Sequence, residues 1–337
     1  MSRLANAALV ALALLAASAA PSRAEVSVVH ASKQYGLGYL QLVVMEDQKL
    51  IEKHAKAAGL GDITVEWATL GGPGAMNEAL ISGAVDLVAV GPAGMVTIWA
   101  KTRGNIDVRG VSGLNSMPLF LLTRNPRIRT IKDFRDGDKI AVTSVKVAMQ
   151  ALMLEMAAAQ TFGDANYAKL DPLTVSMAHP DALTALLSGA GEIDSYFSSP
   201  PYQEMALEKP GIRKILSSTE ILGERVTFVS TATTAKFRKE NPKTFAAIMA
   251  ALAEANAWIN RDKRAAAETY VRVTKDKTPM DLLMAMMNDP EITFTLQPMA
   301  MKKIADFMYR IGTVKVQAQS WKDIYFPEAE ALGGSSG

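Results

Sequence analysis

The pattern of hydrophobic and polar positions repeats one unit twice along the chain. Residues Leu70–Ala93 and His179–Pro201 each open with a helix start marked by glycine or proline and continue as an apolar helix. Each helix ends at a serine and a glycine, Ser82-Gly83 or Ser188-Gly189, and a glycine there favours a left-handed C-cap. An apolar-Asp pair and a short apolar strand follow in both copies. Two copies of one helix–strand unit predict two similar α/β lobes, with the chemistry where their strand ends face each other.

Each lobe is also expected to contain a strand that runs into a polar loop and then into a helix. The strand Glu25–Ala31 leads into the loop Ser32–Gly38, and the strand Lys139–Val142 leads into Thr143–Lys146 and the apolar helix Val147–Phe162. Such a loop places backbone N–H groups at the helix start, where they favour an anion or a carbonyl oxygen. Because the first loop lacks the G-x-G-x-x-G pattern, we expect no dinucleotide cofactor.

The order of these units predicts the limits of the lobes. The runs Leu119–Thr123 and Val226–Ser230 resemble each other and are expected to be the two strands that cross between the lobes. Lobe 1 would then comprise residues 25–123 and 230–330, and lobe 2 residues 124–229.

Both ends of the chain are expected to lie outside the lobes. Arg3, the apolar run Ala5–Ala20 and the small-x-small site Ser22-Arg23-Ala24 are typical of a cleavable signal peptide over residues 1–24, which leaves Glu25 first. The alternative is a retained anchor, although the run is short for a membrane span. Residues 331–337, rich in Gly and Ser, predict a disordered tail. We therefore expect a soluble protein exported to the periplasm.

Composition narrows the possible functions. Of 337 residues, 49% are apolar and 21% charged, which is typical of packed lobes and not of a disordered chain. Removal of Arg3 and Arg23 with the signal peptide leaves 34 basic residues against 34 acidic ones, a balance that argues against nucleic-acid binding. The absence of cysteine excludes disulfides, thiol catalysis and cysteine-based metal sites.

The histidines and acids form no catalytic pattern. His30, His54 and His179 are widely spaced, match no H-E-x-x-H motif and are expected to be structural. Asp86 and Asp194 come from the repeat and are expected to make local turn bonds. We therefore expect no enzyme activity, no catalytic residue, no metal and no cofactor.

Candidate binding groups lie in the two equivalent loops. Lys33 and Lys146, if both face the cleft, favour an anionic ligand, whereas either would otherwise be a solvated loop lysine. Ser32, Gln34 and Ser144 could hydrogen-bond a ligand or simply cap helices. Tyr35 and Tyr196 could stack on a ring or pack in the core, and Gly72 and Gly91 could permit close approach of a ligand or only form turns.

Taken in order, several motifs resemble one protein family. They are the loop Ser32–Gly38, the block G-G-P-x-A-M-x-E-A-L-x-S-G-x-V-D at Gly71–Asp86, the strand end Gly91-Pro92-Ala93, the block Asp133–Ser144, and the second A-L-x-S-G block, which leads to Pro200-Pro201. In these features the chain resembles the periplasmic substrate-binding proteins of nitrate/sulfonate/taurine-type (NitT/TauT) ABC importers, a family similar to the thiamine-pyrimidine precursor proteins. The resemblance extends over roughly Glu25–Phe326, nearly the whole exported chain.

The resemblance implies a type II periplasmic-binding-protein fold, an α/β fold of two lobes with two hinge crossings and a ligand cleft between the lobes. It implies that the lobes close over a small solute and that the closed form docks on an ABC permease in the inner membrane. The family's ligand positions correspond to Ser32, Lys33, Gln34, Tyr35, Gly72, Gly91, Pro92, Ala93, Ser144, Val145, Lys146, Tyr196, Ser198 and Pro200.

We expect a monomer that captures a small organic anion of the sulfonate or carboxylate type. The alternatives are a neutral aromatic or pyrimidine-like ligand, an enzyme similar to those of pyrimidine synthesis, and a sensory binding module of the same fold.

Overall fold

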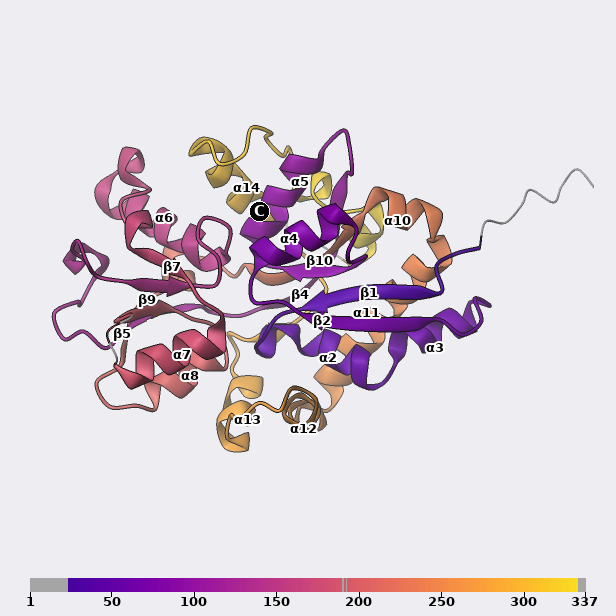
Figure 1. Ribbon diagram of the computed structural model, residues 1–337, viewed down its shortest axis with the longest axis horizontal. Helices are drawn as coiled ribbons and strands as arrows, with labels where there is room; N and C mark the ends of the chain where they lie inside the picture. Colours follow the sequence, from indigo (N-terminus) through magenta and orange to yellow (C-terminus); the bar gives the residue numbers. More distant parts are fainter. Residues whose placement is uncertain (1–23, 190, 192, 333–337) are drawn as a thin grey trace, which may run out of the picture.

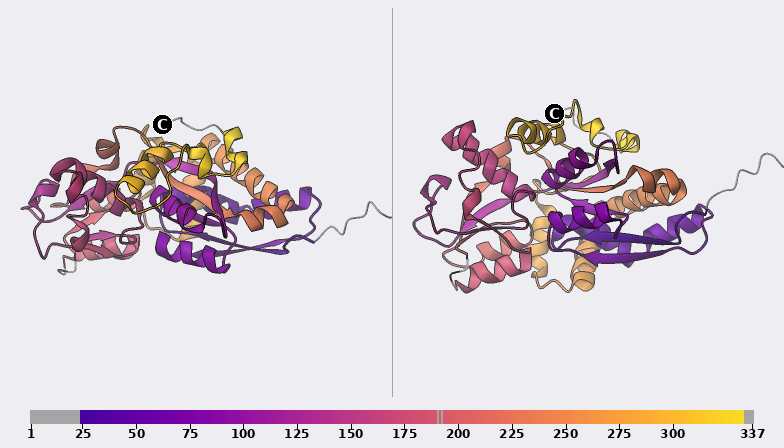
Figure 2. Two further views of the ribbon diagram at one scale, coloured as in Figure 1. Left: turned by 90° about the horizontal axis from the view of Figure 1, so that it is seen from above. Right: turned by 45° about the horizontal axis from the view of Figure 1, so that its top comes forward.

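The structure is a computed structural model that describes residues 24–189, 191 and 193–332. The predicted signal peptide lies outside the described residues except for Ala24, and the predicted tail except for Ala331 and Leu332. Two lobes lie side by side, each with a β-sheet and packed helices (Figures 1 and 2). This arrangement confirms the predicted two-lobe α/β fold.

Lobe 1 is organised around a mixed sheet. Its strands are β1 (Val28–Lys33), β2 (Thr64–Thr69), β3 (Val88–Val90), β4 (Val108–Ser116), β10 (Thr227–Thr234) and β11 (Thr293–Phe294). Strands β11, β4, β10 and β3 are neighbours in that order and pair antiparallel. The parallel pair β1–β2 joins them through a bridge between Ala31 and Leu87.

Lobe 2 has a five-stranded sheet. Its strands are β5 (Phe120–Thr123), β6 (Ile140–Val142), β7 (Thr174–Ser176), β8 (Ser195–Phe197) and β9 (Arg213–Ser217), in the order β7-β6-β8-β5-β9. Strand β6 runs parallel to β7 and β8, whereas β5 runs antiparallel to β8 and β9.

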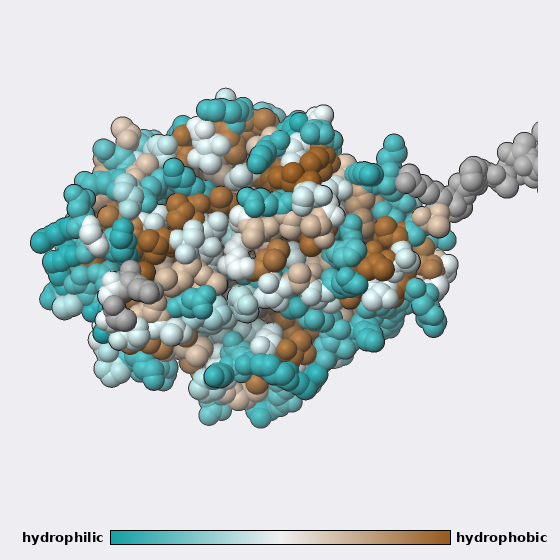
Figure 3. All heavy atoms as spheres, viewed as in Figure 1, coloured by the Kyte–Doolittle hydropathy of each residue, from teal (hydrophilic) through white to brown (hydrophobic). Residues whose placement is uncertain are grey.

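The helices pack around these sheets. Those of lobe 1 are α2 (Leu40–Asp47), α3 (Leu50–Ala57), α4 (Pro73–Ser82), α5 (Pro92–Thr102), α10 (Ala235–Glu240), α11 (Pro242–Arg261), α12 (Lys263–Thr274), α13 (Met280–Asn288) and α14 (Met301–Arg310). Those of lobe 2 are α6 (Met149–Phe162), α7 (His179–Ser188), α8 (Tyr202–Leu207) and α9 (Ser218–Leu222). On the face in Figure 3, apolar residues form small separate patches among polar ones, as on ordinary water-exposed surfaces.

The two copies of the repeat fold alike. Helix α4 ends at Gly83 with φ 77° and helix α7 ends at Gly189 with φ 65°, so both have the left-handed cap that glycine favours. The two aspartates bond mainly to neighbouring segments, although Asp194 also accepts from the hydroxyl of the next residue, Ser195, at 3.1 Å. The Asp86 carboxylate accepts from the backbone N–H of His30 at 2.9 Å, and that of Asp194 accepts from the Asn125 amide at 2.7 Å.

The crossings between the lobes lie a few residues from the predicted positions. The run expected to be the first crossing strand is β5, which pairs with β8 and β9 inside the lobe 2 sheet. The second run includes the start of β10, which pairs with β3 and β4 in lobe 1. The chain therefore passes between the lobes at 117–119 and 223–226. A strand that crosses between two lobes and a strand that pairs inside one sheet can have the same apolar sequence pattern. The pattern therefore could not show which of the two roles each run has.

Glu25, the residue predicted to follow the signal peptide, contacts the start of α11. Its carboxylate accepts from the backbone N–H groups of Lys243 at 2.9 Å and Thr244 at 2.7 Å, and from the Thr244 hydroxyl at 2.8 Å. The N-cap residue of α11, Asn241, makes no side-chain cap bond. The contact therefore satisfies N–H groups at the helix start and opposes the positive end of the helix dipole.

We predict that Glu25→Ala destabilises the protein by about 1 kcal/mol, the usual cost of losing an N-terminal cap. Urea unfolding followed by circular dichroism measures this change. The control is Glu208→Ala, which removes an exposed carboxylate from the C-cap of α8, where no such bond is lost. Equal stability of the two variants would contradict the capping role.

Candidate functional site

Four helices begin along the line where the lobes meet. They are α4 and α5 from lobe 1 and α6 and α7 from lobe 2, with the N-cap residues Gly72, Gly91, Ala148 and Ala178. None of the four N-cap residues makes a side-chain cap bond. The first N–H groups of these helices thus lack a capping partner, and each helix N-terminus carries a partial positive charge.

A small cavity, here called the inner cavity, lies at this convergence. It is lined by Gln34, Tyr39, Pro73, Gly91, Thr143, Met149, Gln150, His179 and Phe228. Its free volume is about 10 Å³, close to the minimum for one water molecule. The lobes are therefore closed on each other, and a larger solute requires them to move apart.

Three polar side chains at the inner cavity make no hydrogen bond to another described residue. Gln34, Tyr39 and Thr143 are only 7%, 4% and 8% exposed. Burial raises the pKa of the Tyr39 hydroxyl, which therefore remains a hydrogen-bond donor at neutral pH. These three side chains are therefore available to hydrogen-bond a solute or water in the cavity.

His179 also lines the inner cavity, although the sequence predicted only a structural role for it. One ring nitrogen, Nδ1, contacts the Tyr196 hydroxyl, and the other, Nε2, lies 3.0 Å from the Ser199 hydroxyl. Its ring stacks on Tyr202 with the centroids 5.3 Å apart. Burial lowers the pKa of His179 to about 3, so the imidazole is neutral at physiological pH.

The two lysines predicted to supply positive charge do not line the inner cavity. The Lys33 ammonium lies 2.6 Å from a carboxylate oxygen of Glu46. Lys146 is exposed, with φ 64°, and its charge acts on Glu155 and Asp171 within lobe 2. Contact of either lysine with a solute stays a prediction.

Among the other residues predicted to bind the ligand, Gln34 and Gly91 line the inner cavity. The others do not line it and lie at these places in the fold: Ser32 at the end of β1, Tyr35 in the next loop, Gly72 before α4, Pro92 and Ala93 in the first turn of α5, Ser144 and Val145 after β6, Tyr196 in β8, and Ser198 and Pro200 just after β8. Their contact with a solute also stays a prediction.

Sequence reasoning missed four polar or ionisable residues at the cavity: Tyr39, Thr143, Gln150 and His179. His179 carries a usable signal, because it precedes Pro180 at the position that Gly72 holds before Pro73 in the first copy of the repeat. Thr143 begins the predicted polar loop Thr143–Lys146 but was not itself a candidate, and Tyr39 and Gln150 follow no pattern that distinguishes them from ordinary helix residues.

A wider groove, here called the outer groove, lies beside the inner cavity and shares Gln34 with it. Its volume is about 590 Å³, and both lobes line it. Its aromatic walls include Tyr35 and Trp67 of lobe 1 and Tyr202 of lobe 2. This groove could hold the part of a solute that extends beyond the inner cavity.

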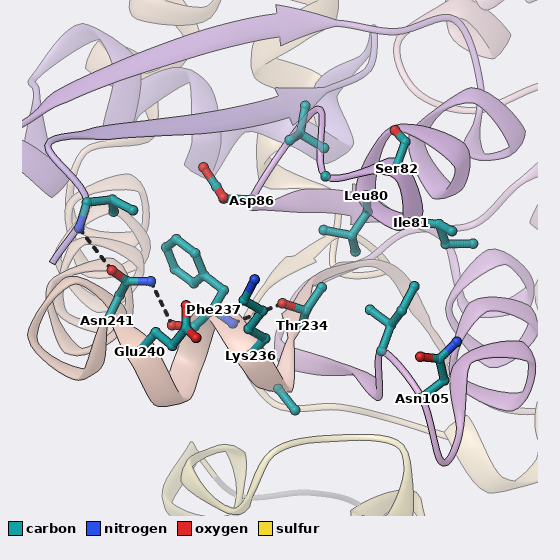
Figure 4. A pocket seen from close by; sticks show the side chains of 15 residues that line it. Leu80, Ile81, Ser82, Asp86, Asn105, Thr234, Lys236, Phe237, Glu240 and Asn241 are labelled. Carbon is teal, nitrogen blue, oxygen red and sulfur yellow. Dashed lines mark hydrogen bonds between the residues drawn. The ribbon is translucent and has the colours of Figure 1, made fainter. Parts of the chain in front are cut away.

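A separate hollow of about 550 Å³ lies within lobe 1 (Figure 4). Leu80 and Phe237 form part of its apolar lining, and Asp86 and Lys236 are among its charged residues. Because all of its walls belong to one lobe, movement of the lobes would not enclose a solute there.

The described part of the chain shows neither a metal-binding cluster nor a membrane-crossing helix. No group of three or more His, Cys, Asp or Glu residues there could hold a metal ion. No helix in that part is long and apolar enough to cross a membrane.

Several solved structures have the same fold. The alkanesulfonate-binding protein SsuA from Xanthomonas axonopodis pv. citri, bound to MOPS, is 17% identical with a TM-score of 0.68, over 93% of this chain and 100% of that chain. The nitrate-binding protein NrtA from Synechocystis PCC 6803 is 13% identical with a TM-score of 0.68, over 92% and 90%. The aliphatic sulphonate binding protein SsuA from Escherichia coli is 18% identical with a TM-score of 0.61, over 90% and 92%.

A comparison with curated protein sequences gave no match. The model of the NMT1-like family, in contrast, matches residues 32–274, which is well over half of the chain. This match agrees with the family resemblance in the sequence motifs and with the two-lobe fold. The chain belongs to the NMT1-like family.

Proposed function

We propose that this protein is the periplasmic solute-binding component of an ABC importer. It would enclose a small organic anion, of the sulfonate or carboxylate type, between its lobes and deliver it to a membrane permease as a monomer. The observation that carries this proposal is the convergence of four uncapped helix N-termini on one interlobe cavity. Two of the similar structures are named as binding alkanesulfonate and nitrate, which are both anions.

Helix N-termini can bind an anion without a cationic side chain. Each helix contributes the equivalent of roughly half a positive charge at its start. None of the described residues that line the inner cavity is lysine or arginine. Gln34, Tyr39 and Thr143 each have a hydrogen-bond donor for the same anion. Selectivity would then depend on the size and hydrogen-bonding pattern of the head group.

Binding without turnover fits the chemistry of the cavity. His179 is the histidine at the inner cavity, and both of its ring nitrogens already have neighbours. Because burial lowers the pKa of His179 to about 3, it would be a weak general base.

A neutral aromatic solute is the second candidate. The observation that favours it is the outer groove, whose walls include the rings of Tyr35, Trp67 and Tyr202. Such a solute would stack on these rings and would depend less on the helix N-termini.

Closure depends on close contacts between the lobes. The backbone N–H of Leu37 donates to the carbonyl of Pro200 across the lobe boundary at 3.1 Å. At Gly72 an added Cβ would lie only 2.4 Å from the carbonyl oxygen of Thr143. At Gly71 an added Cβ would lie 3.7 Å from the Cβ of Ala178, which is ordinary contact. Glycine at 72 is therefore needed for full closure.

We predict that the solute released from gently purified protein is a sulfonate or a carboxylate. Native mass spectrometry of the intact protein, followed by denaturation, identifies the released solute.

For that solute, Gln34→Ala, Tyr39→Phe and Thr143→Val should each weaken the affinity roughly 5- to 10-fold, since a typical hydrogen bond contributes about 1 kcal/mol. Isothermal titration calorimetry measures this. Lys132→Ala, which changes an exposed lysine of lobe 2 that is no candidate binding residue, is the control and should bind normally. A neutral ring compound, or unchanged affinity in all three variants, would refute the anion site.

We also predict that Gly72→Ala holds the lobes apart while each lobe stays folded. Small-angle X-ray scattering in the presence of the solute should give a larger radius of gyration for Gly72→Ala than for the wild type. Gly71→Ala is the matched control and should close normally. Normal closure of Gly72→Ala would contradict this role of the glycine.

A further inference from the structure

The lobes also meet away from the inner cavity, where α8 of lobe 2 faces the segment 274–290 of lobe 1. The sulfur of Met205 on α8 accepts a hydrogen bond from the Thr278 hydroxyl at 3.3 Å. Tyr202, at the start of the same helix, lines the outer groove together with Asp276. Figure 1 shows α8 close to α13 at the lower side of the molecule. Opening of the lobes would therefore change the surroundings of α8.

Glu204 lies on α8, between these two contact residues. One carboxylate oxygen accepts from the side-chain amide of Gln203 at 2.9 Å. The other oxygen, Oε2, is buried and has no hydrogen-bond partner among the described residues. Gln203 also donates to the carbonyl of Pro118 and accepts from the N–H of Phe120, so it fixes α8 to the first crossing.

The lobe 1 segment that faces α8 carries acids and also the bases Lys275 and Lys277, which line the outer groove. Asp289, which follows α13, is the charged residue whose field acts directly on Glu204. Asp276 acts on the neighbouring Tyr202, and Lys277 lines the same groove. From α7, the neighbouring helix in lobe 2, the titratable group beside α8 is the neutral His179, which stacks on Tyr202.

The cation on the second crossing is engaged elsewhere. The Arg225 guanidinium donates to the Pro290 carbonyl at 2.6 Å and to the Thr293 hydroxyl at 3.2 Å. No ion pair joins Glu204 to a base among the described residues. An ionised Glu204 would thus be enclosed without a counter-charge and beside a second carboxylate.

We propose that Glu204 is a proton-dependent latch: the closed arrangement encloses its carboxyl group between α8 and lobe 1, and uptake of one proton there favours closure. This inference rests on the proposed function in one respect, since it takes opening and closing of the lobes as the protein's working motion.

The direction of the pH dependence follows from burial. Burial raises the pKa of Glu204 to about 7 in the closed state, and the charge of Asp289 acts in the same direction. An exposed glutamate titrates near 4.3, so the closed form holds the proton more tightly than an open form in which Glu204 meets water. Protonation of Glu204 therefore stabilises the closed form to its full extent below about pH 4. This stabilisation is lost as the pH rises through about 7.

Spin labels can measure closure without any solute. The chain has no cysteine, so Glu78→Cys on α4 and Asp181→Cys on α7 give two unique labelling sites, both on exposed positions of helices that start at the lobe boundary. Double electron–electron resonance at pH 5.5 and pH 8.5 should show a larger closed fraction at the lower pH. One proton changes the ratio of closed to open molecules by at most about tenfold per pH unit.

In the labelled background, Glu204→Gln should be equally closed at both pH values, because glutamine is neutral and similar in shape. Asp289→Asn should reduce the response and serves as a second variant if Glu204→Gln folds poorly. The matched control is Glu155→Gln on α6. Burial also raises the pKa of Glu155 to about 7, but its charged neighbours Asp171 and Lys146 belong to lobe 2, so its variant should respond like the wild type.

Identical distance distributions of the wild type at both pH values would overturn the latch, as would a full response in Glu204→Gln or a lost response in Glu155→Gln. Because no solute is present, a failure of the latch leaves the proposed binding function intact. Conversely, a pH response in a protein that binds no anion would sustain the latch and refute the binding function.

Discussion

Unsatisfied backbone donors at the starts of four helices are the constraint on which the centre of this molecule depends. A buried N–H group needs an acceptor, and helices α4, α5, α6 and α7 all begin at the lobe boundary without a capping side chain. Four positive helix ends directed at one region also oppose one another. An acceptor that carries negative charge, bound between the lobes, removes both costs at once.

The sequence builds these helix starts from residues that cannot cap them. Proline occupies the first turn of α4, α5 and α7, where its missing N–H loses no helical bond and its fixed φ favours the helix. Glycine or alanine precedes each of the four helices. Small residues without polar side chains let the opposite lobe approach closely, as at Gly72 and Thr143, and leave the donors for a partner outside the chain.

Much of this architecture could be predicted from local patterns. The repeated Ser-Gly helix ends, Gly83 and Gly189, adopt the left-handed conformation that the sequence indicates. The family and the two-lobe fold follow from the order of such motifs. These features are local, because a helix, its cap and the next strand lie within about two dozen residues of each other.

The site was less predictable because its geometry is set by distant residues. Lys33 seemed free in the sequence, but α2 brings Glu46 to within 2.6 Å of it. His179 matched no catalytic or metal motif, yet β8 and the residues after it surround its ring with Tyr196 and Ser199. Neither environment can be read from neighbours in the chain.

The most direct test of this account is amide chemical-shift mapping by NMR with methanesulfonate as the anion probe. Anion binding at the helix N-termini predicts the largest changes in the first turns of the four helices, at Gly74, Ala93, Gln150 and His179, with no comparable change for the neutral dimethyl sulfone. Changes concentrated in the lobe 1 hollow, around Ser82 and Phe237, or equal changes with both compounds, would contradict it.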